Sequence, residues 1–424
     1  MKNKIGVTLL CLLGGYGLLP LLTGCYKNPT TRTYAIYSPV YADKTTALSS
    51  INGPAGQSVD SAGKIYVKDK FIFLNELNKG IHIYDNTDPV HPVQTAYLSI
   101  PGNQDIAVKG NTLYADMYQD LLAIDISDPR HVKVTGTVPG LFMGRSSVNG
   151  YFTNSNGKVI TGWTKKDTTV PIDPVGRPGG GGGFGICRNC PIFEQSLYAS
   201  ASSYSAPGTA GSMAAMVLIN DYLYAISERY SLGIVSIANA SNPSKLSSMP
   251  VGYDLETIYP FKDQLFLGSS EGVYILDLSN PAQPVSKGQF THSRACDPVI
   301  ADGDYAYVTL HDGTACGGFS NELDVINVKY PAQSLLLRTY PMTRPMGLSK
   351  DGDLLFVCDG KAGVKVFNAK DPTNLQMLTA TGGGQAYDVI ASQQHLIVVA
   401  SDGLYQYDYS SPSNLHLLSF LPAK

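Results

Sequence analysis

The residue types that most often do chemistry are present in this 424-residue chain, but their spacing predicts no catalytic or metal-binding motif. The seven histidines form no His-x-His or His-Glu-x-x-His group, which zinc sites of those kinds would require. Asp302-Gly-Asp304 and Asp351-Gly-Asp353 offer the oxygen ligands that calcium prefers, yet neither is followed by an EF-type loop. We therefore predict turns at both places, no catalytic residue, no metal and no cofactor.

Four cysteines are candidates for disulfide bonds. Cys187-Arg-Asn-Cys190 could be a redox pair, half of a zinc site or a local disulfide, and we expect the disulfide because no second Cys-x-x-Cys is present. Cys296 and Cys316 fall within one repeated unit of the sequence, and we expect them to be bonded to each other. Such a bond would restrain the loop that precedes Cys316. Cross-pairing with Cys187 or Cys190 is the alternative.

A motif that recurs about every 40 residues must position these groups. It consists of an apolar strand, an Asp or Asn, three further residues and a proline, as in Leu122-Ala-Ile-Asp-Ile-Ser-Asp-Pro129. The seven copies place the polar residue at Asp85, Asp125, Asn239, Asp277, Asn327, Asn368 and Asp408. Asp and Asn side chains accept hydrogen bonds from the backbone just ahead, and proline ends strand pairing. We therefore expect structural turn residues here, not catalytic ones.

Each repeated unit also has the strands of a propeller blade. Two apolar segments separated by a polar turn precede the motif strand, as in residues 105–115, and a short strand such as 132–138 follows the proline. Asp359-Gly360 and Asp402-Gly403 have the composition of hairpin turns into the motif strand. Seven units of four strands predict an all-β fold, a β-propeller of seven blades, with eight blades as the alternative.

The repeated strings resemble those of the bacterial LVIVD-repeat proteins. Leu122-Ala-Ile-Asp-Ile-Ser-Asp-Pro129 and Val273-Tyr-Ile-Leu-Asp-Leu-Ser-Asn-Pro281 carry the resemblance, which covers roughly residues 57–420 apart from 140–212. The resemblance implies a propeller on a secreted or lipid-anchored bacterial protein. It implies no established activity.

The first strand of each blade lines the central channel of a propeller, so residues near its start lie at the channel mouth. Alignment of the repeats places Asp105, Asp297 and Asp388 at one equivalent position there, with Glu256 and Arg344 close by. Three carboxylates around one opening could bind a cation or a polar ligand. They could equally cap turns or satisfy exposed backbone amides, and both interpretations remain open.

An insertion interrupts the repeat at about residues 145–212. It contains the single tryptophan, Trp163, and an irregular Gly-rich stretch at 176–185. That stretch lacks the Gly-Lys-Ser/Thr ending of a phosphate-binding loop, so a flexible loop is favoured. Asp167-Thr-Thr-Val-Pro171 imitates the motif spacing and is the argument for an eighth blade. An excursion from one face of a seven-bladed ring is the prediction.

Residues 1–24 are predicted to be a lipoprotein signal peptide. Lys2 and Lys4 precede an apolar run that ends in Leu22-Thr-Gly-Cys25. This ending resembles the bacterial lipoprotein signal, which implies that Cys25 becomes the acylated first residue of the mature chain. Residues 25–56 would then be the lipidated cysteine, a tether and a lead-in to the propeller at 57–424. Because Tyr26 rather than Asp follows the cysteine, the resemblance favours anchoring in the outer membrane of the cell envelope.

The composition argues against several functions and leaves two. The net charge is −3 and no basic stripe occurs, so no nucleic-acid partner is predicted. The membrane would be contacted through the acyl chains on Cys25. We expect a non-catalytic binding or scaffolding protein with a protein or polar-ligand partner. The alternative is an exported enzyme, of lyase or hydrolase type, that acts at the mouth of the channel.

Overall fold

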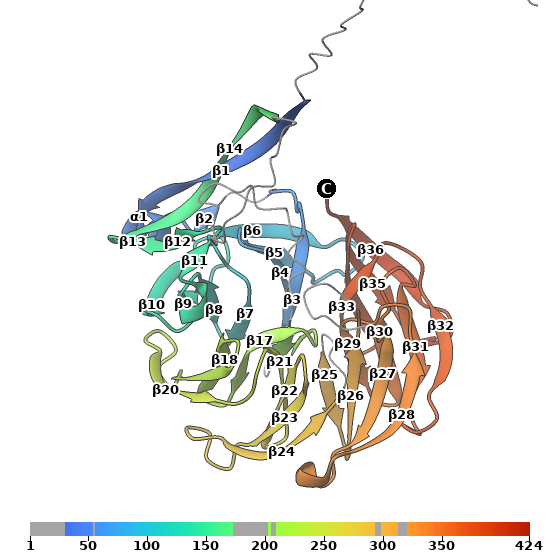
Figure 1. Ribbon diagram of the computed structural model, residues 1–424. Helices are drawn as coiled ribbons and strands as arrows, with labels where there is room; N and C mark the ends of the chain where they lie inside the picture. The colour runs from blue at the N-terminus through green and yellow to red at the C-terminus, as the bar shows by residue number, and fades with distance from the viewer. Residues whose placement is uncertain (1–29, 54–55, 173–201, 205–208, 293–297, 313–319) are drawn as a thin grey trace, which may run out of the picture. The chain divides into compact units, whose positions relative to one another are not determined.

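The computed structural model describes residues 30–53, 56–172, 202–204, 209–292, 298–312 and 320–424, which are mostly β-strand (Figure 1). The helical elements in these ranges are short: α1 (Lys44–Ser49) and the 3-10 helices η1 (Met143–Arg145) and η2 (Pro331–Gln333). Within the same ranges, no helix has the length and apolar character needed to cross a membrane. Several residues singled out above lie outside the described ranges: Cys25, Cys187, Cys190, Cys296, Cys316 and Asp297.

Seven antiparallel four-stranded blades follow one another along the chain. Blade 1 has β3 (Ala62–Lys68), β4 (Phe71–Glu76), β5 (Gly80–Asp85) and β6 (Val93–Ser99), and blade 2 has β7 (Ile106–Lys109), β8 (Thr112–Met117), β9 (Asp120–Asp125) and β10 (Lys133–Val138). Blade 3 has β17 (Ala214–Ile219), β18 (Tyr222–Glu228), β19 (Ser231–Ser236) and β20 (Ser244–Pro250), and blade 4 has β21 (Leu255–Phe261), β22 (Gln264–Ser269), β23 (Gly272–Asp277) and β24 (Val285–Thr291).

The remaining three blades have the same order of strands. Blade 5 has β25 (Val299–Asp302), β26 (Tyr305–Leu310), β27 (Glu322–Asn327) and β28 (Leu335–Pro341), and blade 6 has β29 (Leu348–Asp351), β30 (Leu354–Cys358), β31 (Val364–Asn368) and β32 (Gln376–Ala380). Blade 7 has β33 (Ala386–Ser392), β34 (His395–Ala400), β35 (Gly403–Asp408) and β36 (His416–Pro422). The motif strand predicted from the sequence is the third strand of each blade.

The blades close into a ring. Their first strands neighbour one another in the order β3, β7, β17, β21, β25, β29, β33 and again β3 (Figure 1). A parallel bridge joins Val59 to Ala423, and the Lys424 N–H donates to the Val59 carbonyl at 2.9 Å. Ser419 Oγ donates to the Pro89 carbonyl at 2.7 Å. The predicted seven-bladed β-propeller is therefore confirmed, with the channel lined by first strands.

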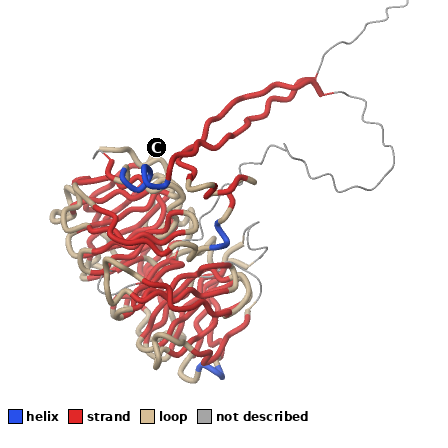
Figure 2. Tube along the Cα trace, turned by 90° about the vertical axis from the view of Figure 1, so that its left-hand side faces the viewer, coloured by secondary structure: helices blue, strands red, loops and turns tan. Residues whose placement is uncertain are grey.

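The insertion adds no eighth blade in its described part. β11 (Ser147–Val148) pairs with β12 (Tyr151–Phe152), and β14 (Lys158–Ile172) pairs with β13 (Asn154–Ser155) and with β1 (Thr30–Asp43). Residues 30–37 of β1 and 165–172 of β14 belong to a small separate unit of two paired strands (Figure 2).

The lead-in to the propeller packs against blades 1 and 2. β2 (Asn52–Gly53) pairs with β6, and the preceding Ile51 is buried. Asn52 bonds the backbone of Val132 twice, its Nδ2 donating to the carbonyl at 2.8 Å and its Oδ1 accepting the N–H at 2.9 Å. Lys44 Nζ lies 2.6 Å from Asp120 Oδ2.

In six blades the third strand ends in the Asp or Asn of the motif. Its Oδ1 accepts the N–H of the residue two positions ahead, at 2.6–3.0 Å, in the pairs Asp85–Thr87, Asp125–Ser127, Asp277–Ser279, Asn327–Lys329, Asn368–Lys370 and Asp408–Ser410. This bond closes the turn that leads to the outer strand.

Blade 3 differs at this turn. β19 ends at Ser236, so Asn239 lies three residues beyond the end of the strand. The Asn239 carbonyl accepts the N–H of Asn242 at 3.0 Å, as the Asp128 carbonyl accepts that of His131 in blade 2. Asn239 therefore corresponds to Asp128, inside the turn, and not to the strand-ending Asp125 of blade 2.

Candidate functional site

The structure brings two of the five residues predicted at the channel mouth into one buried region. Asp105 directly precedes β7 and Asp388 is the third residue of β33, and each is 2% exposed. Lys64 of β3, in the blade between them, acts electrostatically on both carboxyls. Of the other predicted residues, Arg344 lies beside Asp312, with Nε 3.7 Å from Oδ1, and Glu256 is half-buried in β21.

Asp105 forms a buried ion pair with Lys64. Lys64 Nζ lies 3.0 Å from Asp105 Oδ2, and both side chains are buried. The same Oδ2 accepts the N–H of Ala215 at 2.7 Å, and Oδ1 accepts the N–H of Ile106 at 2.8 Å. Burial raises the pKa of Asp105 to about 6, although the Lys64 charge opposes the shift. These bonds of the carboxylate all go to other parts of the chain.

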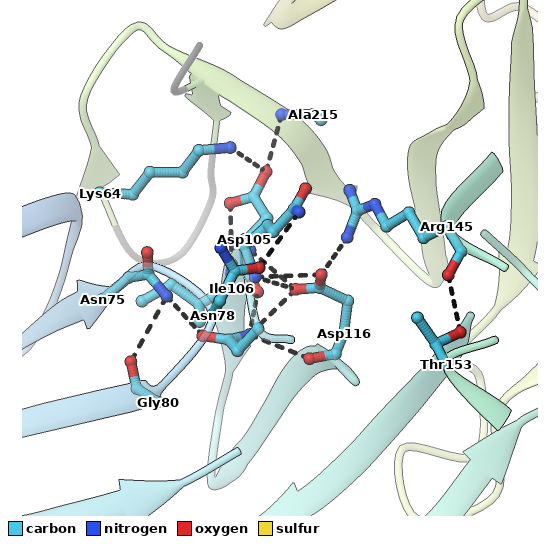
Figure 3. A network of polar contacts seen from close by, with 12 residues as sticks. Lys64, Asn75, Asn78, Gly80, Asp105, Ile106, Asp116, Arg145, Thr153 and Ala215 are labelled. Atoms are coloured by element: carbon cyan, nitrogen blue, oxygen red, sulfur yellow. Dashed lines mark hydrogen bonds and ion pairs between the residues drawn. The ribbon is translucent and has the colours of Figure 1, made fainter. Parts of the chain in front are cut away.

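A second carboxylate, Asp116, holds the connection that enters blade 2 (Figure 3). Asp116 is fully buried in β8. Its Oδ1 accepts the N–H of Asp105 at 2.7 Å, and both of its oxygens lie 3.0 Å from the Gln104 nitrogen. Asn103 Nδ2 donates to Oδ1 at 2.9 Å, and Arg145 of η1 donates to Oδ2. Asp116 therefore ties the insertion to the channel region, a role that sequence reasoning missed.

Asp388 is enclosed by backbone. Its Oδ1 accepts the N–H of Val389 at 2.9 Å and the N–H of Ser212 at 3.1 Å. Gly211 and Gly347 flank the carboxylate so closely that a Cβ at either position would lie within 2.3 Å of one of its oxygens. Burial raises the pKa of Asp388 to about 7, against the effect of these two backbone hydrogen bonds.

These bonds arise because the end of the insertion runs through the channel. β16 (Thr209–Ala210) pairs with β3, with Thr209 opposite Val67 and Ala210 opposite Tyr66. β15 (Ser202–Tyr204) pairs with β17. Since β3 and β17 are the channel-lining strands of blades 1 and 3, both short strands lie on the channel side of the blades. We call residues 209–213 the channel segment; nothing in the sequence pattern predicts its position.

Asp105 and Asp388 therefore satisfy backbone N–H groups, which is one of the two arrangements that the sequence left open; the third carboxylate, Asp297, lies outside the described residues. Leaving a buried N–H unpaired costs about 1–3 kcal/mol, so these side chains stabilise the chain where it turns inside the channel. Among the described residues, no group of three His, Cys, Asp or Glu side chains is placed to hold a metal ion.

Replacing Asp388 with asparagine is expected to change how stability depends on pH. Because the pKa of Asp388 is raised from 3.8 to about 7, the folded protein binds this proton more tightly than the unfolded chain. The carboxyl therefore destabilises the fold progressively as the pH rises from about 4 to 7. An asparagine oxygen can accept the same two N–H bonds without a charge. Relative to wild type, the variant should gain about 2–4 kcal/mol in free energy of unfolding between pH 4 and pH 8.

Urea unfolding at a series of pH values measures this difference. Asp221→Asn is the matched control, because the Asp221 side chain is 63% exposed and its replacement should leave the pH dependence unchanged. A difference between Asp388→Asn and wild type that stays constant from pH 4 to pH 8 would contradict the prediction.

A serine motif that sequence reasoning missed lies in blade 4. Gly268-Ser-Ser-Glu-Gly272 matches the Gly-x-Ser-x-Gly pattern of hydrolase nucleophiles. Here the pattern spans the turn between β22 and β23, whereas a nucleophile elbow joins a strand to a helix. Ser270 is fully buried, so its hydroxyl is closed to a substrate from solvent. The motif is part of a hairpin turn.

A buried histidine in blade 1 is likewise inaccessible to a substrate. His82 is fully buried in β5. Gln94 Nε2 donates to His82 Nδ1 at 2.7 Å, so Nε2 carries the proton and donates to Glu76 Oε2 at 2.9 Å. Burial alone would raise the pKa of Glu76, but hydrogen bonds from His82 and Lys79 leave it lowered. Both ring nitrogens of His82 are therefore engaged within the protein.

Two exposed tyrosines lie on the loops at the mouth end of blades 3 and 4. In an antiparallel blade the start of the first strand and the turn between the second and third strands lie at the same end. Tyr230, in the β18–β19 turn, is 53% exposed, and Tyr253, just before β21, is 52% exposed. The Arg229 guanidinium lies 5.9 Å from the Tyr253 ring centre. η1 lies beside β18, which brings the exposed Met143 of the insertion near the same loops.

Four-stranded blades around a channel lined by their first strands define this chain as a seven-bladed β-propeller. The model of the LVIVD repeat matches residues 102–139 and 265–292. The first match covers the four strands of blade 2 and the second covers β22–β24 of blade 4. The chain therefore contains LVIVD repeats, as its motif strands predicted.

Solved structures agree with the fold. A protein from Lactobacillus plantarum is similar with a TM-score of 0.51 and 13% identity, over 85% of this chain and 96% of that chain. Sqt1 of Saccharomyces cerevisiae is similar with a TM-score of 0.50 and 9% identity, over 91% of this chain and 88% of that chain. At such identities the likeness concerns the fold alone. No curated protein sequence matches this chain significantly.

Proposed function

We propose that this protein is a lipid-anchored β-propeller of the bacterial cell envelope that binds a protein partner and catalyses no reaction. The observation that carries the proposal is the contrast between the closed channel and the exposed mouth-end loops. Asp105 and Asp388 are buried and bonded to backbone, whereas Tyr230 and Tyr253 each expose about half of their surface. Tyrosine beside arginine is a combination enriched at protein–protein interfaces.

The alternative, an exported lyase or hydrolase acting at the channel mouth, has less support. A catalytic group must reach the atom that it attacks or protonates. Ser270, His82 and Asp388 are all buried, and His82 and Asp388 are hydrogen-bonded to other parts of the same chain. Burial raises the pKa values of Asp105 and Asp388 in the channel, but the channel segment packs against Asp388, and Asp105 is bonded to Lys64 and to backbone.

Cys25→Ser should move the protein from the membrane fraction to the soluble fraction of its host. The proposed anchor consists of acyl chains on Cys25, each buried methylene contributing about 0.8 kcal/mol, so losing all of them should release nearly all of the protein. Fractionation followed by immunoblotting measures the distribution. Conversion of Lys27 to Ser is the control and should leave the protein bound. A Cys25→Ser protein that stays on the membrane would contradict the anchor.

The double variant Tyr230→Ser, Tyr253→Ser should lose the protein partner. Truncating aromatic residues at the centre of an interface costs about 2 kcal/mol or more each, so co-purification after crosslinking in the intact envelope should fall at least about tenfold. Tyr330→Ser is the matched control, because Tyr330 is 66% exposed and follows the third strand of blade 5, at the opposite end of the blades. Quantitative mass spectrometry of the crosslinked material measures how much partner remains bound to each variant. Equal loss in the control would refute the assignment to the mouth end.

A further inference from the structure

We infer that the central channel is a binding site for an extended polypeptide, and that the chain's own channel segment, residues 209–213, occupies it. The site is separate from the mouth-end tyrosines of the proposed function, so the two proposals fail independently. Three features of the channel wall carry the inference: the free edges of first strands, side chains that bind backbone, and a position restricted to glycine.

The first feature is strand addition. The channel edge of a first strand has no partner within its own blade, so its N–H and C=O groups are open to another strand. β16 adds to this edge of β3, and β15 adds to the corresponding edge of β17. Addition of an extended segment to a sheet edge is a common mode of peptide recognition, in which main-chain hydrogen bonds supply the affinity.

The second feature is a set of hydrogen bonds at the segment, most of them to its backbone and one to the Ser212 hydroxyl. Asp388 accepts the N–H of Ser212, and Asp105 accepts the N–H of Ala215 in β17, the blade strand that follows the segment. Ser212 Oγ accepts the N–H of Leu348, the first residue of β29. The segment is thus held by strand pairing with blade 1 and by hydrogen bonds to blades 6 and 7.

The third feature is the lack of space for a side chain at position 211. A Cβ on Gly211 would lie 1.9 Å from Asp388 Oδ2, and Asp388 is held on its other side by Gly347. Any other residue at position 211 must therefore displace either the segment or a buried carboxylate. The channel is accordingly specific for an extended, uncharged segment that has glycine followed by a small hydroxyl residue, as in Thr209-Ala-Gly-Ser-Met213.

The segment has fewer bonds than a blade strand. β16 comprises two residues paired on one side, whereas β17 comprises six residues paired on both sides. Elements with few backbone bonds open at lower free energy than the core around them. An external peptide of the same sequence can therefore compete for the channel, with an apparent affinity reduced by the fraction of time that the segment is bound.

The experiment uses the full-length protein and a fluorescent synthetic peptide of residues 202–213. In Gly211→Val protein the internal segment cannot seat beside Asp388, so the peptide should bind at least about tenfold more tightly than to wild type by fluorescence anisotropy. A peptide carrying valine at the position of Gly211 is the matched control and should bind neither protein. Binding of both peptides alike, or no binding of the first peptide to the folded variant, overturns the inference.

Hydrogen exchange on the wild-type protein covers the case in which Gly211→Val fails to fold. If the segment is a displaceable occupant, the Ser212 amide should exchange at least about tenfold faster than the amide of Val217 in β17. In the intact Asp388→Asn protein, the Ser212 amide should likewise exchange faster than the Val217 amide. Equal exchange at the two amides would mean that the segment opens only with the whole propeller, and the inference would be wrong.

Discussion

Deletion of blade 6, residues 342–380, is expected to leave an unfolded protein and not a propeller with one blade fewer. β29 lies between β25 and β33 in the ring, so its removal separates blades 5 and 7. Buried side chains on their facing surfaces, such as Val308 and Val389, would then meet water. A closed ring has no free sheet face, which is why its blades depend on both neighbours.

The deletion also removes Gly347, which packs against Asp388, and Leu348, the hydrogen-bond partner of Ser212. The Gly347 N–H donates to the Tyr387 carbonyl at 2.9 Å, and the Leu348 N–H donates to Ser212 Oγ. Near-ultraviolet circular dichroism and size-exclusion chromatography should show loss of fixed tertiary structure and soluble monomer. Deletion of residues 176–185 is the control, because none of the seven blades contains them. A monomer with a cooperative unfolding transition after loss of blade 6 would contradict ring closure.

The fold could be predicted because the same local sequence motif recurs in each blade. The motif around Asp125 combines an apolar third strand, an acceptor for the next turn and a proline, and these local preferences agree with the final structure. Six of the seven strand ends follow from that pattern. Blade 3 departs because Asn239-x-x-x-Pro243 repeats the spacing of Asp88-x-x-x-Pro92, a later part of the turn, while its strand ends in Ser236.

The channel region could be predicted only in part. The repeat alignment found Asp105 and Asp388 because both occupy an equivalent place in their blades. It could not find Lys64 as their neighbour, nor Ser212 as a donor, because these contacts join residues far apart in sequence. The channel segment has no strand-like alternation of apolar residues, since its pairing partners supply backbone groups instead of an apolar face. Asp116 was missed because its partners are loop backbone N–H groups and the side chains of Asn103 and Arg145, which no motif in the sequence links to it.

Replacing Asp116 with alanine is expected to lower the free energy of unfolding by about 3–5 kcal/mol. The substitution leaves the N–H groups of Gln104 and Asp105 without their acceptor and the Arg145 guanidinium without its partner. Unsatisfied donors in a buried region keep their full desolvation cost, which the small loss of side-chain volume does not offset. Urea unfolding followed by tryptophan fluorescence of Trp163 and by circular dichroism measures the change.

Two further variants test whether hydrogen bonding to the loop is the cause. Asp116→Asn keeps one oxygen as acceptor and should cost less than half as much as alanine, since only the charge and the second acceptor are lost. Asp359→Ala should be as damaging as Asp116→Ala, because the buried Asp359 accepts the N–H groups of Thr343 and Arg344 in the corresponding connection to blade 6. A loss below about 1 kcal/mol for both alanine variants would show that the connections hold their shape without these carboxylates, and that water reaches the freed amides.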